Sequence, residues 1–126
     1  MQLNHTIVYS TDPERSAHFL AAIFNRPAPT RFGHFQVVTL DNDVSLDYMA
    51  TRKPVAPQHY AFLVSEADFD GILERIQAQG LDYWADPAQS RAGRINTHDG
   101  GRGVYFEDPD GHLLEALTVP YGGWPE

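Results

Sequence analysis

One carboxylate stands in an unusual place in this sequence, between apolar residues near the end of the chain. Glu115 lies in a strand-like run in which Leu113 and Leu117 share its face, while Leu114 and Ala116 form the other face. A buried carboxylate is costly unless it is paired or coordinates a metal. The remainder of the chain should therefore supply a partner for Glu115.

Two histidines occupy matching places near the beginnings of strand-like runs. His5 lies early in Leu3–Ser10, and His59 opens His59–Val64. Two histidines and one carboxylate form a recurrent ligand set for divalent metals and leave coordination positions open for water or substrate. This set predicts a metal site at His5, His59 and Glu115. The alternative is that both histidines only pack within their strands and that Glu115 faces solvent at a sheet edge.

Three further side chains are candidates to act on a substrate beside such a metal. Tyr105 can donate a hydrogen bond to a substrate oxyanion, or serve as core packing. His98 can act as a general base near neutral pH if it points inward. Tyr9 shares a strand face with His5, so we expect it to line the pocket unless it only packs against its neighbours.

A glycine-rich segment at 86–103 also contains three arginines. Arg91, Arg94 and Arg102 lie close together there. They suit a clamp on an anionic substrate, because guanidinium groups bind carboxylates and phosphates through paired hydrogen bonds. The alternative is an ordinary solvated loop.

The composition excludes several classes of function. Seventeen acidic residues against nine basic ones give a net charge of −8, which repels nucleic acid. The absence of cysteine removes disulfides and protein thiolates. The apolar runs are too short to span a membrane, and Met1 leads directly into a strand-like segment without a signal sequence. We therefore expect a cytoplasmic protein that binds a small molecule.

Apolar patterns predict the elements that position these residues in the first half of the chain. The strand Leu3–Ser10 precedes a helix over Pro13–Phe24, whose apolar residues recur at helical spacing. Phe35–Leu40 and Val44–Met49 flank a polar turn and are predicted to form a hairpin.

The second half shows the same succession of patterns. A strand at His59–Val64 is followed by a helix over 65–79, which begins at a serine cap. Val104–Glu107 and His112–Thr118 form a predicted hairpin around Asp108-Pro109-Asp110-Gly111, because proline and glycine supply the backbone angles of a tight turn.

These parallels predict an internal repeat. His5 aligns with His59 at an offset of 54 residues, and Val37 aligns with Val104 at an offset of 67. Each half is then one strand, one helix and two or three more strands. We expect each helix to cover one face of its small sheet and to leave the other face concave.

The repeat also predicts the domain organisation. Residues 1–126 form one α+β domain, with repeat one at about 1–52 and repeat two at about 58–119. The proline-containing segment Ala50–Gln58 is the expected linker between them.

Three stretches together resemble the vicinal oxygen chelate superfamily. They are Leu-Asn-His5, His59-Tyr-Ala-Phe and Val-Tyr-Phe-Glu-Asp-Pro-Asp-Gly-His-Leu-Leu-Glu115-Ala. That superfamily includes glyoxalase I, fosfomycin-resistance thiol transferases, extradiol dioxygenases and bleomycin-binding proteins. The resemblance covers nearly the whole chain.

The resemblance implies two βαβββ modules in tandem, an open U-shaped mixed sheet around a metal, and helices on the outer face. It implies one divalent metal per site, of which Mn, Fe, Zn and Ni are the candidates. It also implies a homodimer with shared sites, in which His5 from one subunit joins His59 and Glu115 from the other.

The chain departs from glyoxalase I at the fourth ligand of that enzyme, a carboxylate in the last strand of the first half. The offset of 67 residues puts Tyr48 there, and we expect Tyr48 to contact substrate instead. Asp47 is one residue away, so strand alternation is expected to turn it to the opposite face. A three-ligand site is therefore favoured.

The second half resembles the fosfomycin thiol transferases in its two ligands and in Tyr105, but their Lys and Ser loop is not recognisable. Extradiol dioxygenases share the ligand set but usually occupy longer chains. We therefore expect a metal-dependent enzyme that acts by Lewis-acid chemistry on a small, oxygenated, anionic substrate. The alternatives are a metal-free ligand-sequestering protein of the bleomycin-resistance type and a small extradiol-type dioxygenase.

Overall fold

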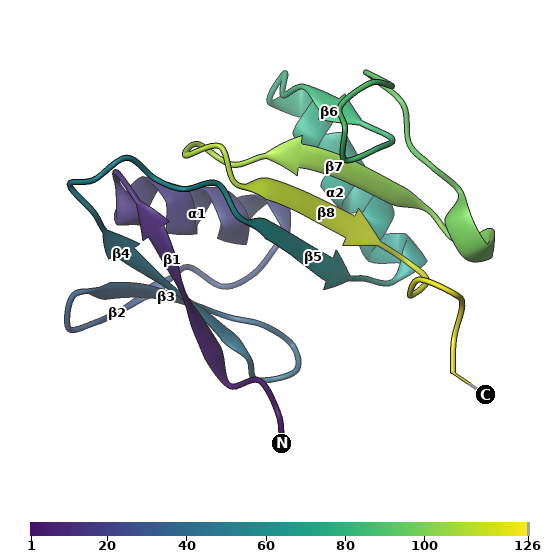
Figure 1. The fold of residues 1–126 in the computed structure, drawn as a ribbon. Coiled ribbons are helices and arrows are strands. Elements are labelled where there is room, and N and C mark those ends of the chain that lie inside the picture. Colours follow the sequence, from purple (N-terminus) through teal and green to yellow (C-terminus); the bar gives the residue numbers. More distant parts are fainter. Residues whose placement is uncertain (126) are drawn as a thin grey trace. The chain divides into compact units, whose positions relative to one another are not determined.

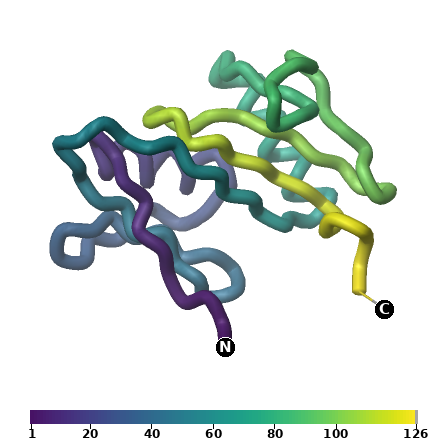
Figure 2. The backbone as a smooth tube through the Cα atoms, viewed as in Figure 1, coloured from purple at the N-terminus to yellow at the C-terminus, as the bar shows by residue number. Residues whose placement is uncertain are grey.

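The computed structural model describes residues 1–125 and divides into two compact units. The first unit comprises Met1–Pro57 together with Asp108–Asp110, and the second comprises Gln58–Glu107 with the chain from Gly111 onward. Figure 1 labels their elements and Figure 2 traces their backbones. No helix in the described part of the chain is long and apolar enough to span a membrane.

The first unit contains one helix and a four-stranded sheet. Its elements are β1 (His5–Ser10), α1 (Pro13–Ile23), β2 (Thr30–Phe32), β3 (Phe35–Thr39) and β4 (Ser45–Ala50). The strand order is β1-β4-β3-β2, with β1 parallel to β4 and the other neighbours antiparallel.

The second unit repeats this arrangement. Its elements are β5 (His59–Leu63), α2 (Glu66–Ala78), β6 (Tyr83–Trp84), the 3₁₀ turn η1 (His98–Gly100), β7 (Gly103–Glu107) and β8 (Leu113–Leu117). The order β5-β8-β7-β6 and the single parallel pair β5–β8 match the first sheet. The predicted α+β fold of two tandem βαβββ modules is therefore confirmed.

Local signals explain where the helices begin and end. Asp12 caps α1 by accepting a hydrogen bond from the Arg15 amide at 3.1 Å, and Ser65 caps α2 in the same way from Asp68 at 3.1 Å. Gly80, at φ +65°, follows α2 in the left-handed conformation that ends many helices. Strands β2 and β6 were not located from the sequence, because three and two residues are too few to show alternation.

One face of each sheet is buried and carries the core. In the first unit, Val8, Val38, Leu46 and Tyr48 are buried together with the apolar face of α1. In the second unit, the buried residues on one sheet face are Val104, Phe106, Leu114 and Ala116, and those of α2 are Phe69, Ile72 and Ile76. On the opposite faces, the two histidines and their neighbours in β1 and β5 are exposed, whereas Tyr105 and Glu115 in the second unit are buried.

Asp110, at the tip of the second hairpin, is a hydrogen-bonding centre of the first unit. Its carboxylate accepts bonds from the Ser10 hydroxyl at 2.5 Å, the Ser16 hydroxyl at 2.7 Å, and the Thr11 amide and hydroxyl at 2.9 and 2.7 Å. Burial opposes ionisation, but these hydrogen bonds outweigh it and lower the pKa of Asp110 to about 2.

We expect Asp110→Asn to lower the free energy of unfolding at pH 7 by about 1–2 kcal/mol, after allowance for solvent screening of this partly exposed carboxylate. The folded-state pKa of Asp110 lies below the unfolded value of about 3.9, so its contribution is present above about pH 4 and is lost as the pH falls toward 2. Denaturant unfolding from pH 7 to pH 2 measures both effects. Asp82→Asn, at an exposed carboxylate, is the control. If the free energy of unfolding fell equally with pH in Asp110→Asn and in wild type, the role assigned to Asp110 would be contradicted.

Candidate metal centre and substrate site

The strand register of the second unit aligns its candidate residues on one face of the sheet. Residues that pair directly across neighbouring strands project from the same face of the sheet. One such row runs from Ala61 in β5 through Glu115 in β8 and Tyr105 in β7 to Trp84 in β6. His59 lies two residues before Ala61 in β5 and therefore shares that face. The fold thus brings His59, Tyr105 and Glu115 together, although they are distant in sequence.

Glu115 is almost completely buried, with 1% of its surface exposed. Its Oε1 atom lies 3.1 Å from His59 Nε2. The hydroxyl of Tyr121 lies 2.8 Å from Oε1 and 2.7 Å from Oε2. The carboxyl group of Glu115 is therefore buried as the sequence indicated, and it contacts His59, which was predicted to lie near it, and Tyr121, which was not.

The tautomer of His59 follows from its second hydrogen bond. Nδ1 lies 3.0 Å from the backbone carbonyl oxygen of Leu113, which can only accept, so Nδ1 carries a proton. In the neutral ring, the Nε2 lone pair then faces the Glu115 carboxylate. Two such acceptors in contact repel each other unless a proton or a cation lies between them.

A divalent metal fits this arrangement. Two ligand atoms that each lie about 2.1 Å from one metal are about 3.0–3.4 Å apart, and His59 Nε2 and Glu115 Oε1 are 3.1 Å apart. Metal-binding histidines commonly donate their other ring N–H to a backbone carbonyl, as His59 does to Leu113. His59 and Glu115 are therefore suited to be two ligands of one ion.

Two tyrosines extend the hydrogen-bond network from Glu115. The hydroxyl of Tyr105 lies 3.0 Å from that of Tyr121, and the Tyr105 ring stacks against His59 with centroids 6.0 Å apart. Burial, the hydrogen bond with Tyr121 and the charge of Glu115 raise the pKa of Tyr105. Burial raises the pKa of Tyr121, and the contact with Glu115 raises it further, whereas the hydrogen bond with Tyr105 lowers the pKa. Both phenols are thus protonated donors at neutral pH.

Three predicted residues line a separate cavity of about 520 Å³ in the long loop of the second unit. They are Arg91, Arg94 and His98. Among residues 1–125, the Arg94 side chain forms no hydrogen bond or ion pair. Its charge is therefore available to an anionic group.

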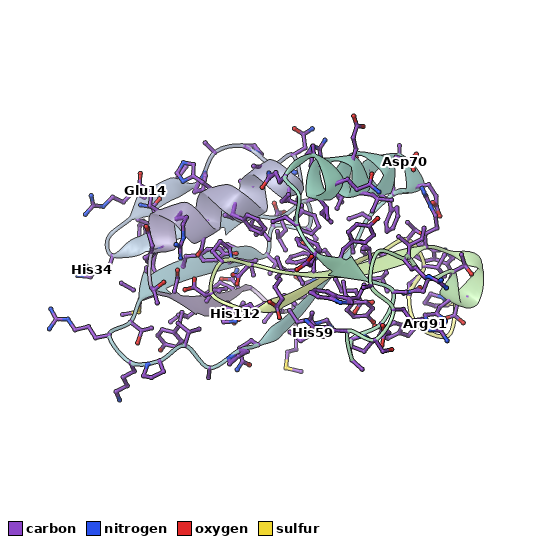
Figure 3. All side chains as sticks on the ribbon, turned by 90° about the horizontal axis from the view of Figure 1, so that it is seen from above. Glu14, His34, His59, Asp70, Arg91 and His112 are labelled. Carbon is purple, nitrogen blue, oxygen red and sulfur yellow. The ribbon has the colours of Figure 1, made fainter. Side chains whose placement is uncertain are left out.

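Arg102 has a different environment from the other two arginines. Its guanidinium lies 2.7 Å from Glu66 and 2.8 Å from Asp70, both on α2, and 4.5 Å from the centre of the Phe69 ring. Figure 3 labels Asp70 on the helix and His59 at the sheet that this helix covers. Arg102 ties the strand to the helix, and its role in substrate binding stays a prediction.

The first unit carries the third predicted ligand. His5 is exposed, with Nδ1 2.7 Å from the Asn4 side-chain oxygen, and Tyr9 projects from the same face with 49% of its surface exposed. Within residues 1–125, no group of three or more His, Cys, Asp or Glu side chains is arranged to hold a metal. His59 and Glu115 lie together in the second unit, and His5 belongs to the first.

The pairing register corrects the predicted equivalence of Tyr48 and Glu115. Ser45 begins β4 as Leu113 begins β8, so the hairpins of the two units are related by 68 residues rather than 67. Asp47, not Tyr48, is therefore the counterpart of Glu115. The one-residue difference reverses the faces, because side chains alternate along a strand.

The same register places these two residues relative to the histidine-bearing face. Asp47 pairs with Ile7 on the face of His5, where it accepts a hydrogen bond from Ser45 at 2.8 Å. Tyr48 faces the helix and is 1% exposed, so the structure does not present it to a substrate.

Tyr121 is the residue at this site that sequence analysis did not identify. It follows the last strand, and no periodic pattern or counterpart in the first half relates it to Glu115. The only signal was its position close to Glu115 in a short glycine-containing tail.

Comparisons with known proteins establish the family of this chain. Residues 2–116 match the family model described as Glyoxalase/Bleomycin resistance protein/Dioxygenase superfamily. The chain belongs to this superfamily. A solved structure named oxidase ChaP-H1 is similar to it with 62% identity and a TM-score of 0.96, covering 98% of this chain and 99% of that one.

Two curated relatives in the superfamily are transferases. The glutathione transferase FosA of Serratia marcescens is 31% identical over 119 residues, which are 90% of this chain and 77% of that protein. The metallothiol transferase FosB of Shouchella clausii is 38% identical over 60 residues, which are 48% of this chain and 37% of that protein. Together with the oxidase, these relatives support an enzyme of this superfamily.

We expect Arg102→Ala to lower the midpoint of thermal unfolding, because it removes two ion pairs and the contact with the Phe69 ring. Arg94→Ala removes no hydrogen bond or ion pair within the described chain and should leave the midpoint unchanged. Differential scanning calorimetry of the two variants tests this division of roles. Equal midpoints would contradict it.

Proposed function

We propose that this protein is a metal-dependent oxidase of a small molecule, with His5, His59 and Glu115 as the metal ligands. The observation that carries the proposal is the position of His59 Nε2, which lies 3.1 Å from the buried Glu115 carboxylate while Nδ1 lies 3.0 Å from the Leu113 carbonyl oxygen. The 62% identity to a protein named as an oxidase supports the reaction class.

Each residue has a distinct role in this proposal. The Leu113 carbonyl holds His59 in one tautomer and one orientation, and Glu115 supplies the negative charge that favours a cation. The bound metal would supply redox chemistry to the substrate. Arg91 and Arg94 hold an anionic group of the substrate. His98, in the same cavity, accepts a proton from the substrate.

The reaction class narrows the choice of metal. Zinc has no accessible redox chemistry, whereas two histidines and one carboxylate with open positions form the ligand set of non-haem iron oxygenases. Iron is therefore favoured over Mn, Zn and Ni.

A Lewis-acid enzyme of the transferase type is the second candidate. Asp47 shares the face of His5 and is the repeat counterpart of Glu115, so a fourth oxygen ligand is available to a non-redox metal. The 31% identity to a glutathione transferase supports this alternative. Oxygen consumption with iron, compared with thiol consumption with zinc or manganese, separates the two candidates.

We further propose that two subunits share each site. His5 shares the exposed side of the edge strand β1 with Ile7, and His59 shares the exposed side of the edge strand β5 with Leu63. Exposed apolar residues at strand edges suit an interface with a second copy of the chain. His5 of one subunit then completes the pair formed by His59 and Glu115 of the other.

We expect wild-type protein purified without a histidine tag or chelator to contain about one metal ion per subunit, and His59→Ala and Glu115→Ala to lose it, because a structural or catalytic ion needs every one of its few ligands. Elemental analysis measures this. His34→Ala, at an exposed histidine in a turn of the first unit, is the control. No metal in wild type, even after reconstitution with each candidate ion, would favour the metal-free sequestering protein instead.

Shared sites predict complementation between two defective variants. When His5→Ala and Glu115→Ala subunits are coexpressed, about half of the dimers are mixed, and each mixed dimer has one complete site of two. Metal content should therefore return to roughly a quarter of the wild-type value. If the ligands instead come from one subunit, every site lacks a ligand and the coexpressed protein stays metal-free.

A further inference from the structure

The segment that follows β8 places a phenol directly on the Glu115 carboxylate. We call Val119–Gly123 the C-terminal strap. Tyr121 of the strap contacts both carboxylate oxygens, at 2.8 and 2.7 Å. This contact lies within the second unit and links the end of the chain to the proposed metal ligand.

A tight turn sets the position of Tyr121 in the strap. The Gly123 amide donates to the Pro120 carbonyl at 2.9 Å, and Gly122 has φ +81°, as the third residue of a type II turn requires. The Gly122 amide also donates to the Asp99 carboxylate at 3.0 Å. The turn is therefore fixed both internally and to the preceding loop.

Close packing against the loop holds the beginning of the strap. A Cβ atom at Gly101 would lie 2.7 Å from Thr118 Oγ1 and 2.7 Å from Val119 Cγ2, so only glycine fits without a shift. The amide of Arg102 donates to Thr118 Oγ1 at 2.8 Å, and the Thr118 amide donates to the Arg102 carbonyl at 2.9 Å. Thr118, which precedes the strap, and Val119, which begins it, are thus held against the backbone of Gly101 and Arg102.

Hydrophobic burial does not explain where Tyr121 lies. The residue is 65% exposed, whereas its hydroxyl reaches the buried Glu115 carboxylate and the hydroxyl of Tyr105. A tyrosine that served only as packing would bury its ring and leave its hydroxyl near water. The arrangement here is the reverse.

We propose that Tyr121 is a positioning residue for the metal ligand Glu115. Its phenol holds Oε2 by donating a hydrogen bond, so that Oε1 stays beside His59 Nε2 and available to the metal. Tyr105 donates to the Tyr121 oxygen and thereby orients the phenol toward the carboxylate. This inference rests on the proposed metal site.

The test is Tyr121→Phe, with metal affinity measured by chelator competition on the full-length protein. Loss of a hydrogen bond to a metal ligand typically weakens binding by about 10- to 100-fold, and we expect a loss of that size. The visible spectrum of the Co²⁺-substituted site should change as well, because the carboxylate is no longer held. Trp124→Phe, at another exposed aromatic residue immediately after the strap, is the matched control and should change neither readout.

A second variant moves the phenol without removing it. Gly122→Ala strains the left-handed turn residue, and Gly33→Ala places the same strain in a hairpin of the first unit as its control. We expect weaker metal binding for Gly122→Ala only, and no additional weakening when it is combined with Tyr121→Phe, since both act through one hydrogen bond.

Three outcomes distinguish this inference from the proposed function. Weaker metal binding in Tyr121→Phe and Gly122→Ala, with both controls unchanged, supports the positioning role. Wild-type affinity in Tyr121→Phe, together with metal loss in Glu115→Ala, overturns the inference and leaves the proposed metal site intact. Failure of wild-type protein to bind any of the four metals overturns both.

Discussion

The buried charge of Glu115 is the constraint on which the site in the second unit depends. A carboxylate removed from water must regain its solvation from neighbouring groups, and here His59 and Tyr121 provide the contacts. Each neighbour is in turn held by the backbone: His59 by the Leu113 carbonyl and Tyr121 by a turn bonded to Asp99. The environment of Glu115 therefore depends on strands β5 and β8, on the loop that contains Asp99 and on the segment that contains Tyr121.

The repeated βαβββ topology explains why both histidines lie on open faces. In each unit the helix covers one face of the sheet, and the first strand pairs in parallel with the last. The residues that alternate with each histidine, such as Val8 in β1 and Phe62 in β5, are buried or half-buried on the helix side, so the histidine faces away from the helix. The same rule puts Asp47 and Glu115 at equivalent positions in the two units.

Two arginines that lie eight residues apart in sequence, Arg94 and Arg102, have different surroundings in the fold. Arg94 lines a cavity in the long loop, while Arg102 is bonded to Glu66 and Asp70 of α2. The difference arises because Arg102 directly precedes a strand whose residues alternate between the open face and the helix-covered face. Proximity in sequence therefore predicted one clamp where the structure has two separate environments.

Sequence by itself determined the two helices, the longer strands and the tandem modules, and it singled out His59 and Glu115 as candidates, because helical spacing, strand alternation, caps and turn residues are local signals. Only the tertiary structure decided the register and the contacts. The offset between the two hairpins was predicted one residue too short, so Tyr48 was aligned with Glu115 in place of Asp47. Because side chains alternate along a strand, this difference of one residue placed the counterpart of Glu115 on the wrong face of the sheet. The contact between Tyr121 and Glu115 depends on a turn and on packing around Gly101, which no periodicity encodes.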